Sequence, residues 1–295
     1  MTWRFQGLRS NVLHMKGRPW HSKHNIFLAP AMNQSTEINL HQYYILLADS
    51  RTRSWPLMGS PVPIASIIAF YLLFATHLGP RLMRDHKPLN IRRIVCIYNV
   101  IMVCLSFYFI YISIQYVVMF KGGYLLCLPS DSRASPENMY FLTRAWYYLL
   151  MKAGEMLDTA FFVLMKKDSH LSFLHILHHS LALWSVWLTL TIGVTGQVYS
   201  FPLLNSAVHV VMYSYYAMAA MGPSVKRHLW WKKYVTLCQI AQFVLLSCHA
   251  LIPVFVDCGF PKFLSAVGAL EGFLFAALFS DFYYTRYVRK VKKVT

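Results

Sequence analysis

Long apolar segments dominate this chain of 295 residues and set its predicted architecture. Seven of them follow residue 61, at about 62–79, 94–119, 141–165, 172–192, 198–220, 234–255 and 263–283. A helix that crosses a bilayer needs roughly 20 mainly apolar residues. The pattern therefore predicts an all-α, polytopic membrane protein with seven transmembrane helices within residues 62–283. Residues 1–61 are mixed in character and are expected to form an N-terminal extension, without the apolar stretch of a cleavable signal peptide.

The composition agrees with a membrane protein. Hydrophobic residues make up 57% of the chain and charged residues 13%, whereas a soluble domain is about 25% charged. The aromatic content of 16% excludes a disordered chain. At this length one bundle is favoured over two domains.

The distribution of Lys and Arg orients the predicted bundle. The net charge is +17, from 28 Lys and Arg against 11 Asp and Glu. Sixteen of the basic residues lie in 80–93, 166–171, 222–233 and 284–295, and three lie in the opposing loops 120–140, 193–197 and 256–262. Cytoplasmic loops carry such an excess, so the basic tail 284–295 is expected in the cytosol and the N-terminal extension on the other side. Seven basic residues in the extension oppose this orientation, but long tails weigh less. The excess thus reports topology and predicts no nucleic-acid partner.

The third predicted span carries a polar stripe, KAGEMLDT, inside an apolar segment. Lys152, Glu155, Asp158 and Thr159 follow steps of three and four residues and so share one helix face. Ionisable groups inside a membrane are costly and mark functional sites by default. The alternative is an internal ion pair that holds helices together.

Three imidazoles open the fourth predicted span, in the sequence LHILHH. His175, His178 and His179 are spaced i, i+3 and i+4, which places them on one face. A single membrane histidine is usually a hydrogen-bonded packing residue, whereas three on one face favour chemistry. Histidine serves as a metal ligand, a general base or a nucleophile, so the residue type alone does not choose.

Polar side chains continue in the last three spans. They are Asn205, His209, Tyr213 and Tyr216 in the fifth, Thr236, Gln239, Gln242 and His249 in the sixth, and Glu271 alone in the seventh. Tyrosines can anchor at the membrane interface and amides can hydrogen-bond between helices, and both remain alternatives to ligand contacts. Asn205 together with His209 favours a polar cavity.

Three kinds of protein could carry this arrangement of polar residues. A membrane di-iron desaturase or hydroxylase uses an HxxHH sequence, but it needs several histidine clusters, and here His209 and His249 stand alone. A seven-span receptor or transporter matches the span count, but the chain has neither an Asp/Glu-Arg-Tyr triplet nor an NPxxY sequence. Acyl transfer fits best, because a desolvated imidazole oriented by Asn or Asp can attack a thioester or accept a proton. Basic loops would attract the phosphates of CoA.

These motifs resemble those of the very-long-chain fatty acid elongase (ELO) family. KAGEMLDT fits KxxExxDT, LHILHH fits HxxHH, NSAVHVVMY fits NxxxHxxMY and TLCQIAQ fits TxxQxxQ, all in the family's order. The match covers nearly all of the chain from the first span onward. The sequences LNSAVHVVMYSYY and LWWKKY look most like animal members.

The resemblance implies a fold, a reaction and partners. Members are seven-helix proteins whose last six helices form a barrel around an acyl tunnel. They condense a long-chain acyl-CoA with malonyl-CoA to a 3-ketoacyl-CoA, releasing CO₂ and CoA. This is the first step of the elongation cycle in the endoplasmic reticulum membrane, and no metal or other cofactor is expected. Membrane lipid and other elongation-cycle enzymes, in a homo- or hetero-oligomer, are the further partners considered.

The resemblance also implies residue roles. The catalytic group is His175, His178, His179 and His209, and the supporting or substrate-binding residues are Lys152, Glu155, Asp158, Thr159, Asn205, Tyr213, Gln239 and Gln242. Lys166, Lys167, Lys232 and Lys233 are candidates for the CoA phosphates. We expect His178 to be the nucleophile that forms an acyl-imidazole, with a general-base role as the alternative. One position departs from some subgroups, because His170 stands where they carry Gln, so this marker does not assign the acyl class.

Three further signals concern the compartment. Cys127 and Cys258 are expected to form a disulfide, because both lie in loops predicted to face the oxidising lumen, while the other four cysteines fall inside spans. Asn33 begins a glycosylation sequon on the predicted luminal extension. Lys292 and Lys293 form a KKxx-type retrieval signal for the endoplasmic reticulum, which requires a cytosolic C-terminus.

Overall fold

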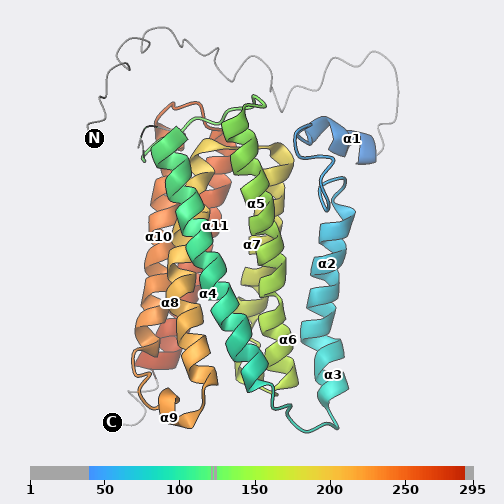
Figure 1. Ribbon diagram of the computed structural model, residues 1–295, viewed down its shortest axis with the longest axis vertical. Coiled ribbons are helices and arrows are strands. Elements are labelled where there is room, and N and C mark those ends of the chain that lie inside the picture. The colour runs from blue at the N-terminus through green and yellow to red at the C-terminus, as the bar shows by residue number, and fades with distance from the viewer. Residues whose placement is uncertain (1–39, 121, 123–124, 290–295) are drawn as a thin grey trace, which may run out of the picture. The chain divides into compact units, whose positions relative to one another are not determined.

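The computed structural model describes residues 40–120, 122 and 125–289, and every regular element within them is a helix (Figure 1). The elements in order are α1 (Leu40–Leu47), α2 (Val62–Leu73), η2 (Phe74–Leu78), α3 (Gly79–Met83), α4 (Arg92–Gln115), η3 (Tyr116–Phe120), α5 (Pro136–Glu155), α6 (Leu157–Leu164), η4 (Asp168–His170), α7 (Phe173–Ile192), η5 (Gly196–Tyr199), α8 (Ser200–Ala220), α9 (Pro223–Lys226), α10 (Lys232–Phe255), α11 (Lys262–Tyr283) and η6 (Tyr284–Val288). The η elements are π- or 3₁₀-helical turns. Asn33, Lys292 and Lys293 lie outside the described residues.

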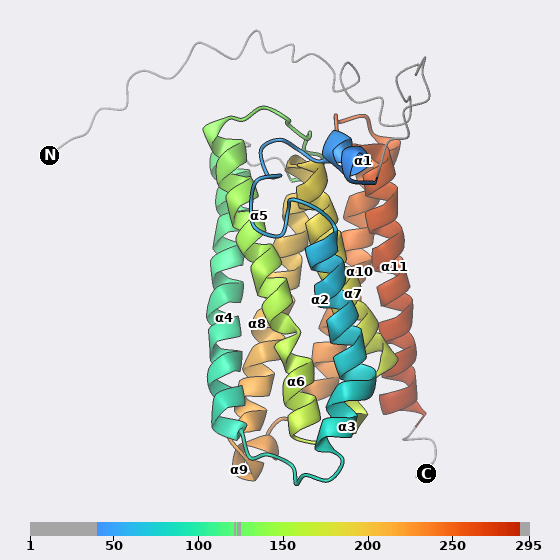
Figure 2. The same ribbon diagram turned by 90° about the vertical axis from the view of Figure 1, so that its right-hand side faces the viewer.

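Five helical stretches of the described residues are long and apolar enough to cross a bilayer. They are Val62–Met83, Arg92–Val118, Phe173–Ile192, Lys232–Phe255 and Lys262–Val288. The chain is therefore a multi-pass membrane protein. The other two predicted spans are helical as well, in α5 with α6 and in α8, and they lie alongside the five (Figure 2). They are less apolar, because α5 carries four charged residues and α8 carries Asn, His, Ser and Tyr side chains.

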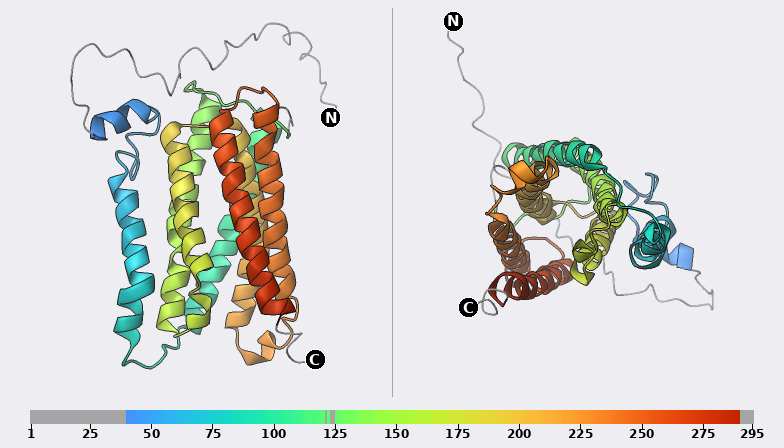
Figure 3. Two further views of the ribbon diagram at one scale, coloured as in Figure 1. Left: turned by 180° about the vertical axis from the view of Figure 1, so that it is seen from behind. Right: turned by 90° about the horizontal axis from the view of Figure 1, so that it is seen from below.

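The long helices follow one another around a ring. Figure 3, in its view along the helix axes, shows the order α4, α5 with α6, α7, α11, α10 and α8. Each helix of the ring packs against the next, and the most extensive pairings are α4 with α8 and α10 with α11. The helices α2 and α3 lie outside the ring, against α7 and α6 respectively.

The helix α4 has an exposed apolar face and a buried polar one. Ile94, Ile97 and Ile101 follow steps of three and four residues and are 56%, 62% and 52% exposed. Asn99 and Ser106 are buried on another face, and each donates a hydrogen bond to the backbone carbonyl four residues earlier. Apolar residues outside and polar residues inside reverse the pattern of a soluble helix.

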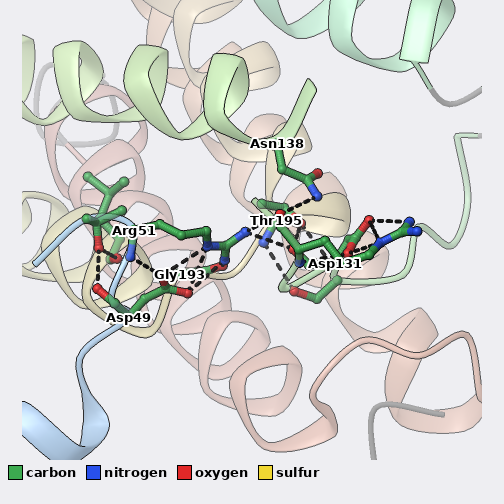
Figure 4. A network of polar contacts seen from close by, with 10 residues as sticks. Asp49, Arg51, Asp131, Asn138, Gly193 and Thr195 are labelled. Atoms are coloured by element: carbon green, nitrogen blue, oxygen red, sulfur yellow. Dashed lines mark hydrogen bonds and ion pairs between the residues drawn. The ribbon is translucent and has the colours of Figure 1, made fainter. Parts of the chain in front are cut away.

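A polar clamp closes the end of the bundle where α5 begins and α7 ends (Figure 4). The Arg51 guanidinium pairs with Asp49 at 2.7 Å and donates to the backbone carbonyls of Asp131, Arg133 and Gly193. Gly193 has φ +69°, and a Cβ there would overlap the Asp49 carboxylate. The clamp joins the chain before α2 to the loop before α5 and to the end of α7.

Part of the predicted N-terminal extension thus packs on the bundle. Tyr44 and Met58 are buried, and the Tyr44 hydroxyl donates to the Met58 carbonyl. At the same end, Cys127 and Cys258 are joined by a disulfide with Cα atoms 5.9 Å apart. This is the cysteine pair predicted from the loop positions.

Candidate active site

A serine cap fixes where the histidine cluster begins. Ser172 Oγ accepts a hydrogen bond from the His175 backbone N–H at 3.2 Å, so α7 starts at Phe173. His175, His178 and His179 then occupy its first two turns. Ring centroids lie 4.4 Å apart for His175 and His179, and 5.4 Å apart for His178 and His179. The predicted spacing therefore does bring the three imidazoles together.

The predicted polar stripe contains a buried ion pair. Lys152 Nζ lies 2.8 Å from Glu155 Oε1, and both side chains are at most 2% exposed. Lys152 Nζ and the Tyr148 hydroxyl both donate to Asn205 Oδ1, at 2.6 and 2.7 Å. His209 Nδ1 lies 3.2 Å from Glu155 Oε1 without hydrogen-bond alignment, and His209 Nε2 lies 3.2 Å from Asn205 Nδ2. The ion pair weighed as an alternative is present, and it also anchors two of the predicted site residues on α8.

The other two residues of the stripe contact different partners. The Asp158 carboxylate accepts a hydrogen bond from the Tyr213 hydroxyl at 2.9 Å. Thr159 Oγ1 lies 2.8 Å from His175 Nε2. The α5–α6 break at Met156 separates the ion pair from these two residues, so one sequence motif serves two parts of the site.

Two cavities meet at His178. A polar cavity of about 190 Å³ is lined, among others, by the predicted residues Asp158, His175, His178, His179, Asn205, His209, Thr236, Gln239 and Gln242. An apolar cavity of about 220 Å³ is lined by residues that include Phe109, Ile112, Ala182, Val186, Leu246 and Phe275. His178, Asn205 and Phe243 line both cavities. The His178 ring also meets the edges of Phe243, Phe275 and Phe279, at centroid distances of 5.9, 5.1 and 6.0 Å.

Several of the predicted site residues do not line either cavity. Lys152, Glu155, Thr159 and Tyr213 are buried behind the lining residues and line neither cavity. Of the four lysines considered for CoA, only Lys232 lines the polar cavity. Lys166 Nζ instead donates to the Arg84 carbonyl at 3.1 Å. His249, in the sixth predicted span, lines the apolar cavity together with Gln197. Its ring lies within hydrogen-bond distance of Gln197 Nε2 and of the Leu125 carbonyl oxygen.

Two basic side chains at the polar cavity were not among the site residues predicted from the sequence. His170 and Arg286 line it beside Lys232. Burial, and then the charges of Lys232, Lys167 and Arg286, lower the pKa of His170 to about 4, so this imidazole is neutral at neutral pH. His170 lies in a short turn and Arg286 in the basic tail, so neither belongs to a helical spacing pattern that would have indicated a site residue.

The sequence also did not predict a role for Tyr148, whose hydroxyl donates to Asn205 Oδ1 as Lys152 does. It sits in a run of aromatic residues whose spacing does not separate a packing ring from a hydrogen-bond donor.

Within the described part of the chain, no group of three or more His, Cys, Asp or Glu residues is arranged to hold a metal ion.

Comparison with known proteins places this site in a family. Residues 56–295 match the ELO family, described as the GNS1/SUR4 family. Very long chain fatty acid elongase 1 of Mus musculus is 38% identical over 260 residues, which cover 85% of this chain and 91% of the relative. Elongase 7 of Rattus norvegicus is 38% identical over 260 residues, covering 86% and 91%. Elongase 4 of Macaca mulatta is 36% identical over 269 residues, covering 91% and 84%. The chain belongs to the ELO (GNS1/SUR4) family.

Proposed function

We propose that this protein is a very-long-chain 3-oxoacyl-CoA synthase, the condensing enzyme of fatty acid elongation. It joins a long-chain acyl-CoA to malonyl-CoA and yields a 3-ketoacyl-CoA, CO₂ and CoA. The observation that carries the proposal is the place of His178, where an apolar cavity meets a polar one. The apolar cavity suits an acyl tail, and the polar cavity suits the thioester and the malonyl group.

The condensation runs in two steps through His178. The imidazole attacks the acyl thioester carbon, the C–S bond breaks, and CoA leaves with the imidazole proton. Malonyl-CoA then loses CO₂, and its α-carbon attacks the acyl-imidazole. The new C–C bond forms as the acyl C–N bond breaks, and the released imidazolate of His178 takes up a proton from water. The alternative is that the histidine cluster acts as a general base without a covalent intermediate.

The polar cavity offers groups for the malonyl end and for CoA. Gln242 is 4% exposed, and its Nε2 has no hydrogen-bond partner among the described residues. A buried amide donor without a partner is costly, so we assign Gln242 to a substrate carboxylate or thioester carbonyl. Lys232 and Arg286 supply positive charge for the CoA phosphates at the same cavity.

The proposal extends to topology and compartment. All seven predicted spans cross the membrane, and the six after α3 form a barrel around the acyl tunnel, with the basic helix ends in the cytosol. Lys232 begins α10 and Cys258 follows the end of that helix, while Arg286 lies just after the end of α11, so the disulfide and these basic residues lie at opposite ends of the bundle. An oxidising lumen at the disulfide end supports this orientation. The C-terminus is then cytosolic, as the KKxx signal requires, and the membrane is that of the endoplasmic reticulum.

The test is condensation by purified or microsomal protein with labelled malonyl-CoA and a panel of acyl-CoAs. His178→Ala should abolish product while the protein still accumulates in the membrane. The matched control is His228→Ala, at an exposed imidazole that is hydrogen-bonded to the Ser224 carbonyl and lines neither cavity; it should retain activity. Mass spectrometry after incubation with acyl-CoA alone should find the acyl adduct on His178. Full activity in His178→Ala would exclude both the nucleophilic and the general-base role.

A further inference from the structure

The helix α2 lies outside the ring, yet one of its side chains reaches the histidine cluster. Tyr71 is 5% exposed, and its hydroxyl lies 3.0 Å from Thr159 Oγ1. Thr159 is fully buried, and its Oγ1 lies 2.8 Å from His175 Nε2. Two hydrogen bonds therefore run from α2 through α6 to the first imidazole of α7.

The neighbours of Tyr71 on α2 make this contact notable. Phe70 and Leu72 are 63% and 39% exposed on the outer surface of the bundle. A hydroxyl buried from such a helix is costly unless it is hydrogen-bonded. The close approach that permits the bond is set at Gly79, where a Cβ would meet Val163 of α6 at 2.8 Å. A glycine therefore lets the outer helix lie close enough for Tyr71 to reach Thr159.

The direction of the two hydrogen bonds follows from donor accounting. If Tyr71 donates to Thr159 and Thr159 donates to His175 Nε2, each hydrogen has an acceptor. In the reverse direction the Tyr71 hydrogen would be left over, and if Tyr71 and His175 both donated to Thr159 the Thr159 hydrogen would be left over, because the described residues give neither hydroxyl another hydrogen bond. A buried donor without an acceptor costs about 1–3 kcal/mol, so the first direction is favoured.

We propose that Tyr71, on the helix outside the ring, is a positioning residue that acts through Thr159 to hold His175 as the neutral tautomer protonated on Nδ1. The Nε2 lone pair is then occupied, and the Nδ1–H is the one hydrogen-bond donor that the ring can offer. His175 lines the polar cavity, so this donor serves the carbonyl of the substrate. The neighbouring rings of His179 and Phe162, at 4.4 and 5.4 Å, confine the imidazole. The role in catalysis rests on the proposed condensing function.

Four variants of the full-length protein test this relay: Tyr71→Phe, Thr159→Val, Thr159→Ser and the double variant Tyr71→Phe/Thr159→Val. We expect Tyr71→Phe and Thr159→Val each to lower kcat by roughly three- to tenfold, the scale of one hydrogen bond. The KM values for acyl-CoA and malonyl-CoA should stay unchanged, because neither side chain lines a cavity. Thr159→Ser keeps the hydroxyl and should retain kcat, and the double variant should lose no more than a single one.

Tyr199→Phe is the matched control, because its buried hydroxyl donates to the Leu125 carbonyl at the other end of the bundle. It should retain the wild-type kcat. The relay would be overturned if Tyr71→Phe kept the kcat of the unmodified protein, or if the losses of the two single variants multiplied in the double variant. In either case, condensation by the unmodified protein would still support the proposed function. An inactive wild-type protein would instead overturn the function. If Tyr71→Phe fails to accumulate, equal kcat in Thr159→Ser and Thr159→Val would overturn the relay by itself.

Discussion

The buried ion pair permits a quantitative prediction that separates stability from catalysis. Lys152→Met would leave the Glu155 carboxylate, 1% exposed, without the cation that lies 2.8 and 3.0 Å from its two oxygens. Removing one member of such a pair costs about 3–5 kcal/mol, because the remaining charge keeps its desolvation penalty. Asn205 Oδ1 adds no further cost to the free energy of unfolding, because it still accepts a hydrogen bond from Tyr148 at 2.7 Å. At 2–4 °C per kcal/mol, the melting temperature should fall by roughly 6–20 °C.

The double variant Lys152→Met/Glu155→Leu should recover most of this loss. Replacing both members of a buried pair by apolar residues is often neutral or stabilising. Activity should not return, because Asn205 loses the Lys152 ammonium that donates to it and His209 loses the neighbouring Glu155 carboxylate. Thermal unfolding followed by tryptophan fluorescence in detergent, and condensation by the same preparations, measure the two effects separately.

A surface pair provides the control for this experiment. Arg133→Met breaks the contact with Asp131, in which the arginine side chain is 75% exposed. Such a pair contributes about 0–1 kcal/mol, so its loss should change the melting temperature little. A Lys152→Met protein as stable as wild type, or a double variant no more stable than Lys152→Met, would contradict the account of the ion pair.

Three further predictions concern other parts of the molecule. Replacing Cys127 and Cys258 by Ser opens a link across 131 residues and should cost roughly 4–5 kcal/mol in the chain-entropy model. Thermal unfolding measures this, and kcat per folded molecule should not change. Burial and three basic neighbours lower the pKa of His170 to about 4. The negative charge of the CoA phosphates would raise the pKa of His170. By linkage, CoA should therefore bind more tightly as the pH falls from about 7 to about 5. Calorimetry should show proton uptake in wild type and less of it in His170→Gln. Glu271, hydrogen-bonded to Ser185 in the apolar cavity, is the third site. Glu271→Leu should lower KM for saturated acyl-CoA and leave KM for malonyl-CoA unchanged, and a raised acyl-CoA KM would contradict this.

The sequence determined those features that depend on a short stretch of chain. Each of the seven predicted spans coincides with helix in the structure, because apolar length and helical hydrogen bonding are local properties. The imidazoles of His175, His178 and His179 lie together because spacings of three and four residues share a face in any α-helix. The pairing of Lys152 with Glu155 follows from the same rule.

Tertiary packing decided which helix faces meet, and no periodicity encodes that choice. Lys152 and Asn205 are 53 residues apart and are joined only because α5 and α8 present polar faces to one interior. The run of apolar residues around Tyr71 gave no sign that its hydroxyl reaches Thr159, 88 residues away. The meeting of a polar and an apolar cavity at His178 depends on side chains from several helices at once. These contacts arise because buried polar groups must find partners wherever the packed helices place them.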